Sequence, residues 1–265
     1  MIKAISKLPF GPTVLEFIEF LGDYSTFIWV AMKRTLSPPW RGRMVIDQLY
    51  LIGVKSFPIA MITAIFVGMV MTLQTGVQLV KFGSKGYVPG ISWIANAREM
   101  VPAFVGIVVG ARVAASITAE VGTMRVTEQI DALEVLNVDP IRYLVAPRVI
   151  AMTIMMPLIT AVCLVGGYIG GTLVAASALQ IDYVQYYMVT KKFAYMQDLY
   201  SGLFKTIFFG ILIAVTGSYY GFRTRGGAEG VGLATTSSVV LTLLTILVSN
   251  YFLTSILVSL MGNLG

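Results

Sequence analysis

The chain has 265 residues, of which 57% are hydrophobic and only 12% are charged. A soluble domain of ordinary composition carries about 25% charged residues, so this chain lacks the charge needed to cover a water-facing surface. The composition excludes a soluble globular enzyme, a disordered chain and a disulfide-rich secreted domain. It predicts an all-α integral membrane protein.

Three further counts narrow the chemistry. The sequence contains no His, which removes the usual general base, the commonest metal ligand and the usual pH switch. The single Cys163 lies in an apolar run, so neither a disulfide framework nor a thiolate metal site is expected. The net charge is +6, and the cations lie mostly in short segments between apolar runs. This pattern indicates membrane topology and anionic lipid rather than nucleic acid.

The first 50 residues differ from the rest of the chain. Glu16, Glu19 and Asp23 share one helix face inside an apolar stretch. Because a spanning helix tolerates three carboxylates poorly, we expect an amphipathic helix in the inner membrane interface. The aromatic residues expected to face the acyl chains are Phe17, Phe20, Phe27 and Trp29. A second short helix, about 41–55, leads into the membrane domain, which is assigned to residues 51–265.

Five apolar stretches are long enough to cross a hydrocarbon core of ~30 Å as helices. They cover about 57–80, 101–119, 149–179, 203–222 and 233–260. They are helices rather than barrel strands because their apolar residues do not alternate. With the N-terminus inside, eleven cations fall in inner segments and five in outer loops. This asymmetry favours a cytoplasmic N-terminus and an outer C-terminus.

Several glycines are spaced for close helix contact within these stretches. They are Gly106 and Gly110 in the second, Gly166, Gly167, Gly170 and Gly171 in the third, and Gly210, Gly217 and Gly221 in the fourth. Small residues allow helix backbones to approach one another in lipid. The pattern fits packing within the subunit and also fits a dimer face.

The inner loop between the second and third stretches predicts a short amphipathic helix at about 123–136. Gly122 and Thr123 favour a helix start, and the helix stops before Pro140. Its apolar stripe consists of Val126, Ile130 and Leu133, and its acidic flank consists of Glu128, Asp131 and Glu134. A helix lying on lipid would place these acids against an anionic leaflet. A docking helix fits better, with the stripe in a groove of a cytoplasmic partner and the acids against its cations.

The residues of this loop resemble a known family. The segment Thr127–Leu136, followed by Val138–Pro140 and Ala146–Arg148, closely resembles the signature of the MlaE/YrbE permeases. Upstream, Ala97–Pro102, Gly110–Arg112 and Thr118–Gly122 are also similar. These permeases are the membrane subunits of ABC transporters associated with MCE proteins. The resemblance extends from about Arg41 to the C-terminus.

The resemblance implies a fold, a set of partners and a substrate. Two permease copies, here expected as a homodimer, form the transmembrane core, and an MCE-domain protein lies on the outer side. A cytoplasmic P-loop ATPase docks on the loop helix, called the coupling helix. The residues carried over to this contact are Glu128, Gln129, Ile130, Asp131, Leu133 and Glu134. The complex is expected in a bacterial inner membrane, with a periplasmic C-terminus, moving phospholipids between inner and outer membranes.

The chain itself shows no catalytic motif. It lacks the G-x-x-x-x-G-K-[ST] phosphate loop, G-x-S-x-G and H-E-x-x-H, so we expect no enzyme activity and no cofactor. ATP hydrolysis is expected on the partner chain. Two alternatives remain: a permease for another hydrophobic substrate such as a sterol or a solvent, and a membrane scaffold that docks a cytoplasmic partner.

Ionisable groups within or beside spans are candidate substrate contacts. Arg98, Glu99 and Lys205 are expected to form a polar collar near the outer side that engages a lipid phosphate; the alternative is a salt bridge that only fixes packing. Gln74 and Gln78, one turn apart, either line the same cavity or hydrogen-bond between helices.

Two further groups are expected to be structural. Arg112 lies deeper in the second stretch, and we expect it to pair with Glu120 two turns away. Tyr183, Tyr186 and Tyr187 lie beside the outer end of the third stretch and are typical of an aromatic belt.

Overall fold

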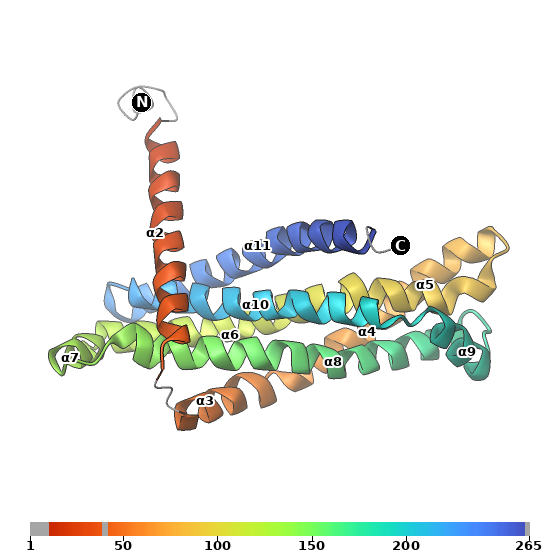
Figure 1. The fold of residues 1–265 in the computed structure, drawn as a ribbon, viewed down its shortest axis with the longest axis horizontal. Coiled ribbons are helices and arrows are strands. Elements are labelled where there is room, and N and C mark those ends of the chain that lie inside the picture. The colour runs from red at the N-terminus through yellow and green to blue at the C-terminus, as the bar shows by residue number, and fades with distance from the viewer. Residues whose placement is uncertain (1–10, 39–41, 263–265) are drawn as a thin grey trace.

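The computed structural model describes residues 11–38 and 42–262, and every regular element in this part of the chain is helical (Figure 1). Residues 1–10 and 39–41, which belong to the expected N-terminal segment, lie outside the described part. Five helical segments there are long and apolar enough to cross a membrane, namely Gly42–Lys81, Lys85–Val126, Ile141–Ser177, Met196–Phe222 and Gly227–Leu260. The expected all-α fold with five spans is therefore confirmed.

The elements follow one another with short connections. In chain order they are α2 (Gly11–Leu36), α3 (Gly42–Gln48), η1 (Leu49–Val54), α4 (Phe57–Lys81), η2 (Lys85–Tyr87), α5 (Val88–Ala95), η3 (Asn96–Met100), α6 (Val101–Val126), α7 (Gln129–Val135), η4 (Ile141–Val145), α8 (Ala146–Ser177), α9 (Tyr183–Phe193), α10 (Met196–Phe222) and α11 (Gly227–Gly262). The helices extend beyond the apolar stretches because the hydrogen-bonded backbone continues past the apolar side chains that define a stretch.

Helix α6 forms the centre of the bundle, in contact with α4, α10 and α11. Its buried side chains recur every fourth residue, at Val101, Val105, Val109, Val113, Ile117 and Val121. Because each step of four residues advances about 40° around an α-helix, this stripe winds around α6 and meets more than one neighbouring helix. The small, branched residues in this stripe pack closely, and the mostly valine stripe places α6 in the core.

Glycines allow α4 and α8 to lie in backbone contact. A Cβ atom at Gly68 would lie 2.0 Å from the carbonyl oxygen of Gly167, and one at Gly170 would lie 2.2 Å from that of Ile65. Gly210 of α10 meets Met152 of α8 in the same way, at 2.5 Å from its carbonyl oxygen. Of the two roles that the glycine spacing allows, these positions therefore serve packing within the subunit.

Helix α2 runs across the long helices, near the end of the bundle that carries α7 (Figure 1). Tyr24 and Phe27 are buried against α10, where both rings contact Tyr219. Asp23 accepts a hydrogen bond from the Arg223 guanidinium at 2.5 Å. Burial raises the pKa of the Tyr24 phenol, whose oxygen lies 2.6 Å from Thr216 Oγ1. The helix thus has a fixed attachment to the bundle through α10, and its place in the membrane interface stays a prediction.

The aromatic residues of α2 divide between two surroundings. Phe20 and Phe27 pack against the bundle, whereas Phe17 and Trp29 are exposed. The expectation that all four face acyl chains is therefore corrected for the two that meet α10, because the helix presents one side to the protein.

Candidate functional site

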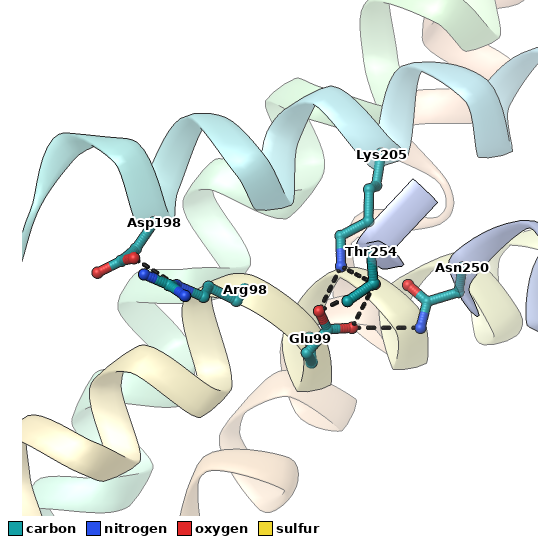
Figure 2. A network of polar contacts seen from close by, with 6 residues as sticks. All are labelled: Arg98, Glu99, Asp198, Lys205, Asn250 and Thr254. Atoms are coloured by element: carbon teal, nitrogen blue, oxygen red, sulfur yellow. Dashed lines mark hydrogen bonds and ion pairs between the residues drawn. The ribbon is translucent and has the colours of Figure 1, made fainter. Parts of the chain in front are cut away.

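A network of polar side chains joins three helical segments near the ends of the spans opposite α7. Glu99 of η3 occupies its centre, with Lys205 of α10 and Thr254 and Asn250 of α11 around its carboxylate (Figure 2). The Lys205 ammonium donates to Glu99 Oε1 at 2.8 Å and to Thr254 Oγ1 at 3.0 Å. Asn250 Nδ2 donates to Glu99 Oε2 at 3.3 Å. Both carboxylate oxygens are thus held by donors from different helices.

Burial makes this network energetically consequential. The Lys205 side chain is fully buried, while that of Glu99 retains 30% of its exposure. A charge in an apolar interior is costly unless it is paired and hydrogen-bonded. Lys205 meets this condition only through residues far away in sequence. Glu99 lies in a π-helical turn, a local widening that often occurs at functional sites, and this turn presents its side chain toward α10 and α11.

A second ion pair lies beside the first. Arg98 donates through Nε to Asp198, which is fully buried in the first turn of α10 (Figure 2). The second carboxylate oxygen of Asp198 is buried and has no hydrogen-bond partner among the described residues. The pair leaves an acceptor unsatisfied, as expected where water or a ligand group completes the site.

The structure brings together three of the five expected substrate contacts. Arg98, Glu99 and Lys205 lie in the network, whereas Gln74 and Gln78 lie on the exposed side of α4. No hydrogen bond within the described part of the chain joins either glutamine to the network.

Sequence reasoning missed three members of the network, namely Asp198, Asn250 and Thr254. Asn250 did carry a signal, because an amide inside an otherwise uncharged span needs a partner. Asp198 lies outside the predicted fourth stretch, and nothing local marks its burial. The partners of these residues become neighbours only when distant helices pack.

The inner-loop helix is shorter than predicted and begins later. Helix α6 continues through Gly122 and Thr123 to Val126, and Glu128 then adopts a left-handed conformation with φ 60°. The chain reverses there into α7, so the expected start at about 123 is corrected to Gln129. Gly122 is part of the packed region, since a Cβ atom there would lie 2.8 Å from Thr224 Oγ1.

The apolar stripe of α7 faces its own chain rather than outward. Ile130 is 1% exposed and belongs to the main core, and Leu133 packs against it. Asp131 accepts a hydrogen bond from Arg125 at the end of α6. The surface left for a partner contains Glu128, Gln129 and Glu134, together with Val135 and Leu136, which are 86% and 72% exposed. The expected use of the stripe as the docking surface is therefore corrected, because the stripe anchors α7 to α6.

Arg112 does not pair with Glu120. Glu120 binds Arg148 of α8 at 2.8 Å, and Arg112 donates to Ser56 Oγ at 2.6 Å. Residues eight apart on a helix are separated by about 12 Å along its axis, so partners on neighbouring helices are closer. Of the three expected belt tyrosines, Tyr183 and Tyr187 are exposed, and Tyr186 is buried.

These features define a class of protein. The chain is a multi-pass helical membrane protein with a buried charge network between its spans. Within the described residues, no group of three or more Cys, Asp or Glu side chains is placed to hold a metal ion.

Comparison with known proteins identifies the family. Residues 45–256 match the family described as Permease MlaE. A probable ABC transporter permease protein of Rickettsia prowazekii is 39% identical over 248 residues, which are 93% of this chain and 95% of that protein. One from Synechocystis is 41% identical over 211 residues, 80% of each chain. This chain therefore belongs to the MlaE family of ABC transporter permeases.

A plant protein is also similar. The chloroplastic protein TRIGALACTOSYLDIACYLGLYCEROL 1 of Arabidopsis thaliana is 35% identical over 216 residues, covering 82% of this chain and 61% of that protein. As an ABC transporter permease, the chain is a non-catalytic membrane component, and its family membership implies a separate ATPase partner.

Proposed function

We propose that this permease moves phospholipids between the inner and outer membranes, as a homodimer with an MCE-domain protein on the outer side and a cytoplasmic ATPase. The observation that carries the proposal is the network around Glu99 and Lys205. The network consists of two cations and two acids at the ends of the spans opposite α7, which we assign to the outer side. A phospholipid has the matching chemistry, with a charged phosphate attached to long apolar chains.

Two observations support a lipid as the substrate. An apolar cavity of about 520 Å³ lies against the outer half of α10 and α11 and is lined in part by Phe204, Ile207 and Leu257. It lies on the same helices as Lys205 and Thr254, so one molecule can contact both a charged group and apolar walls. The name of the plant relative is that of a diacylglycerol lipid, which favours a lipid over a sterol or a solvent.

The path from ATPase to substrate follows one continuous helix. Ile130 fixes α7 against the core, and the ion pair between Arg125 and Asp131 ties it to the end of α6. Helix α6 continues without a break into η3, which carries Glu99. A displacement of α7 by the closing ATPase pair therefore reaches the network as a movement of Glu99 relative to Lys205. Exchange of partners between an ion pair and a lipid phosphate then changes the affinity of the cavity.

Lipid crosslinking in the purified transporter tests this role. Glu99→Ala and Lys205→Ala are each expected to reduce the yield of photoreactive phospholipid crosslinked within the complex. Lys192→Ala, which removes an exposed cation of α9 near the same end, serves as the matched control and is expected to leave the yield unchanged. Equal yields in all three variants would show that the network only fixes packing.

Purification in mild detergent tests the assembly. A P-loop ATPase and an MCE-domain protein are expected to co-purify with the permease in a complex that contains two permease copies. Recovery of the chain with a cytoplasmic partner that has no ATPase would instead support the scaffold alternative.

A further inference from the structure

A polar cavity lies on the other half of the bundle, between η1 and α6. Its volume is about 350 Å³, which is within the range of sites that bind small ligands. Its apolar wall is formed by Leu51, Ile52, Val113 and Ile117, and its polar wall by Gln48, Lys55, Arg112, Ser116 and Glu120. None of these residues belongs to the network around Glu99.

Within the described residues, neither Lys55 nor Arg112 forms an ion pair with a carboxylate. Arg112 uses one guanidinium N–H to donate to Ser56 Oγ at 2.6 Å, and a guanidinium has five such donors. The side chain of Lys55 forms no hydrogen bond or ion pair with any residue in the described part of the chain. The acid in the wall, Glu120, is already bound to Arg148 at 2.8 Å. The cavity therefore has an excess of positive charge.

The position of the cavity corresponds to the inner leaflet. Lys55 lies just before the first residue of α4, whereas Lys81 ends that helix on the outer side in the proposed orientation. Glu99 of η3 and Arg112 of α6 lie on one continuous helical segment. They are thirteen positions apart, which corresponds to about 20 Å along the helix axis. The two polar sites are thus separated by most of the thickness of a hydrocarbon core.

We propose that this cavity binds the phosphate of an inner-leaflet phospholipid between Lys55 and Arg112. The inference rests on the lipid transport proposed above and adds a second headgroup site on the inner side of the path. Arginine and lysine form short charge-assisted hydrogen bonds with phosphate oxygens. The apolar wall accommodates the glycerol and the first carbons of the acyl chains. A free phosphate ion has no apolar part to contact this wall.

Site-specific crosslinking in the assembled transporter tests the proposal. A photoreactive phenylalanine analogue replaces Leu51, a wall residue that is 42% exposed. In nanodiscs of phosphatidylglycerol and phosphatidylethanolamine, irradiation is expected to attach phospholipid to this position. Lys55→Gln and Arg112→Gln are each expected to lower the adduct roughly tenfold, the effect of losing one charge-assisted hydrogen bond. Lys81→Gln removes an equal charge at the other end of α4 and is expected to change nothing.

Four results would overturn the inference. An undiminished adduct in Lys55→Gln would do so most directly, since the Lys55 side chain forms no hydrogen bond or ion pair with the described residues that the change would remove. Equal labelling by a diacylglycerol without phosphate would remove the role of the phosphate. Suppression of adduct formation by inorganic phosphate added before irradiation would assign the site to a free anion. Attachment of the probe to a second permease copy would show that the cavity is a subunit contact.

The outer network provides the internal reference for this test. If the inner site fails while Glu99→Ala still reduces crosslinking at the outer site, only the further inference is lost. Absence of lipid adducts at both sites in the intact complex without these substitutions would instead contradict the proposed function.

Discussion

Removing one partner of the Glu99–Lys205 ion pair is expected to lower the stability of the fold more than replacing both partners by apolar residues. Removing one partner leaves the other as an uncompensated charge in an apolar interior, whereas replacing both by apolar groups of similar shape removes two desolvation penalties together. Lys205 is the more sensitive member because its side chain is fully buried. A pair with this balance adds little net stability, which fits the role in transport that we propose for it.

Lys205→Met is expected to leave Glu99 unpaired, and Glu99→Gln is expected to leave Lys205 unpaired. Each change should lower the free energy of unfolding by on the order of 3 kcal/mol. The double variant should recover most of this loss but should remain inactive in lipid transport. Thermal unfolding in detergent measures the stability, and lipid transfer by the reconstituted complex measures the activity. Additive losses in the double variant would contradict the expected coupling of the two residues.

At the residue scale, sequence predicts candidates better than it predicts partners. Arg98, Glu99 and Lys205 stand out because ionisable groups are rare in apolar segments. Their partnerships depend on helix packing, so the role of Asp198 is not visible from the sequence. The expected pairing of Arg112 with Glu120 was wrong for the same reason, since a neighbouring helix supplies the nearer group.

At the scale of elements, glycine determines how closely α4 and α8 approach. Gly68→Val would place a side chain 2.0 Å from the carbonyl oxygen of Gly167 and force the two helices apart. The expected loss of stability is about 3 kcal/mol, the upper part of the usual range for overpacking. Gly22→Ala is the matched control, because a Cβ atom there meets nothing within 4 Å. That change should raise stability by about 0.5–1 kcal/mol through helix propensity.

Thermal unfolding of both glycine variants in the same detergent checks this pair of expectations. A tolerated Gly68→Val with an unchanged midpoint would mean that α4 and α8 separate without cost.

Helix α7 packs one face against its own chain and leaves another exposed, where we expect the ATPase to dock. Val135 and Leu136 are among the most exposed apolar residues, at 86% and 72%, while Ile130 is 1% exposed. The double change Val135→Asp with Leu136→Asp is therefore expected to abolish binding of the ATPase subunit while the permease remains folded. Ile130→Asp should instead destabilise the permease itself, because it places a carboxylate in the core.

Co-purification of the ATPase, read together with the unfolding midpoint of the permease, separates these two effects. Normal ATPase recovery with the Val135 and Leu136 variant would place the docking surface elsewhere.

The elements were predictable where hydrophobic length determines them. The five apolar stretches all correspond to long helices, because lipid leaves few other backbone solutions. The ends of the helices were less predictable. Helix α6 passes its expected end because Gly122 packs against Thr224, and α7 begins after a left-handed residue, Glu128, that no local propensity marks.

At the scale of the whole molecule, the positive charges concentrate at one end of the bundle. The end with α7 carries Arg125, Arg142, Arg148 and Arg223. Helix α2 crosses the bundle near this same end and is fastened there by Asp23 and Arg223 (Figure 1). Cationic loops remain preferentially on the cytoplasmic side, so this end is expected to face the cytoplasm.

Labelling of single cysteines tests the orientation in intact cells. The only native cysteine, Cys163, is buried, so Cys163→Ala provides a background without an accessible thiol. Ser37 follows α2 and Ser177 ends α8, and both are exposed at opposite ends of the bundle. With a membrane-impermeant maleimide, Ser177→Cys is expected to react in intact cells. Ser37→Cys should react only after permeabilisation, because the arginine-rich end of the bundle is retained inside. The reverse pattern would invert the molecule, placing the network around Glu99 at the inner side and the cavity around Lys55 at the outer side.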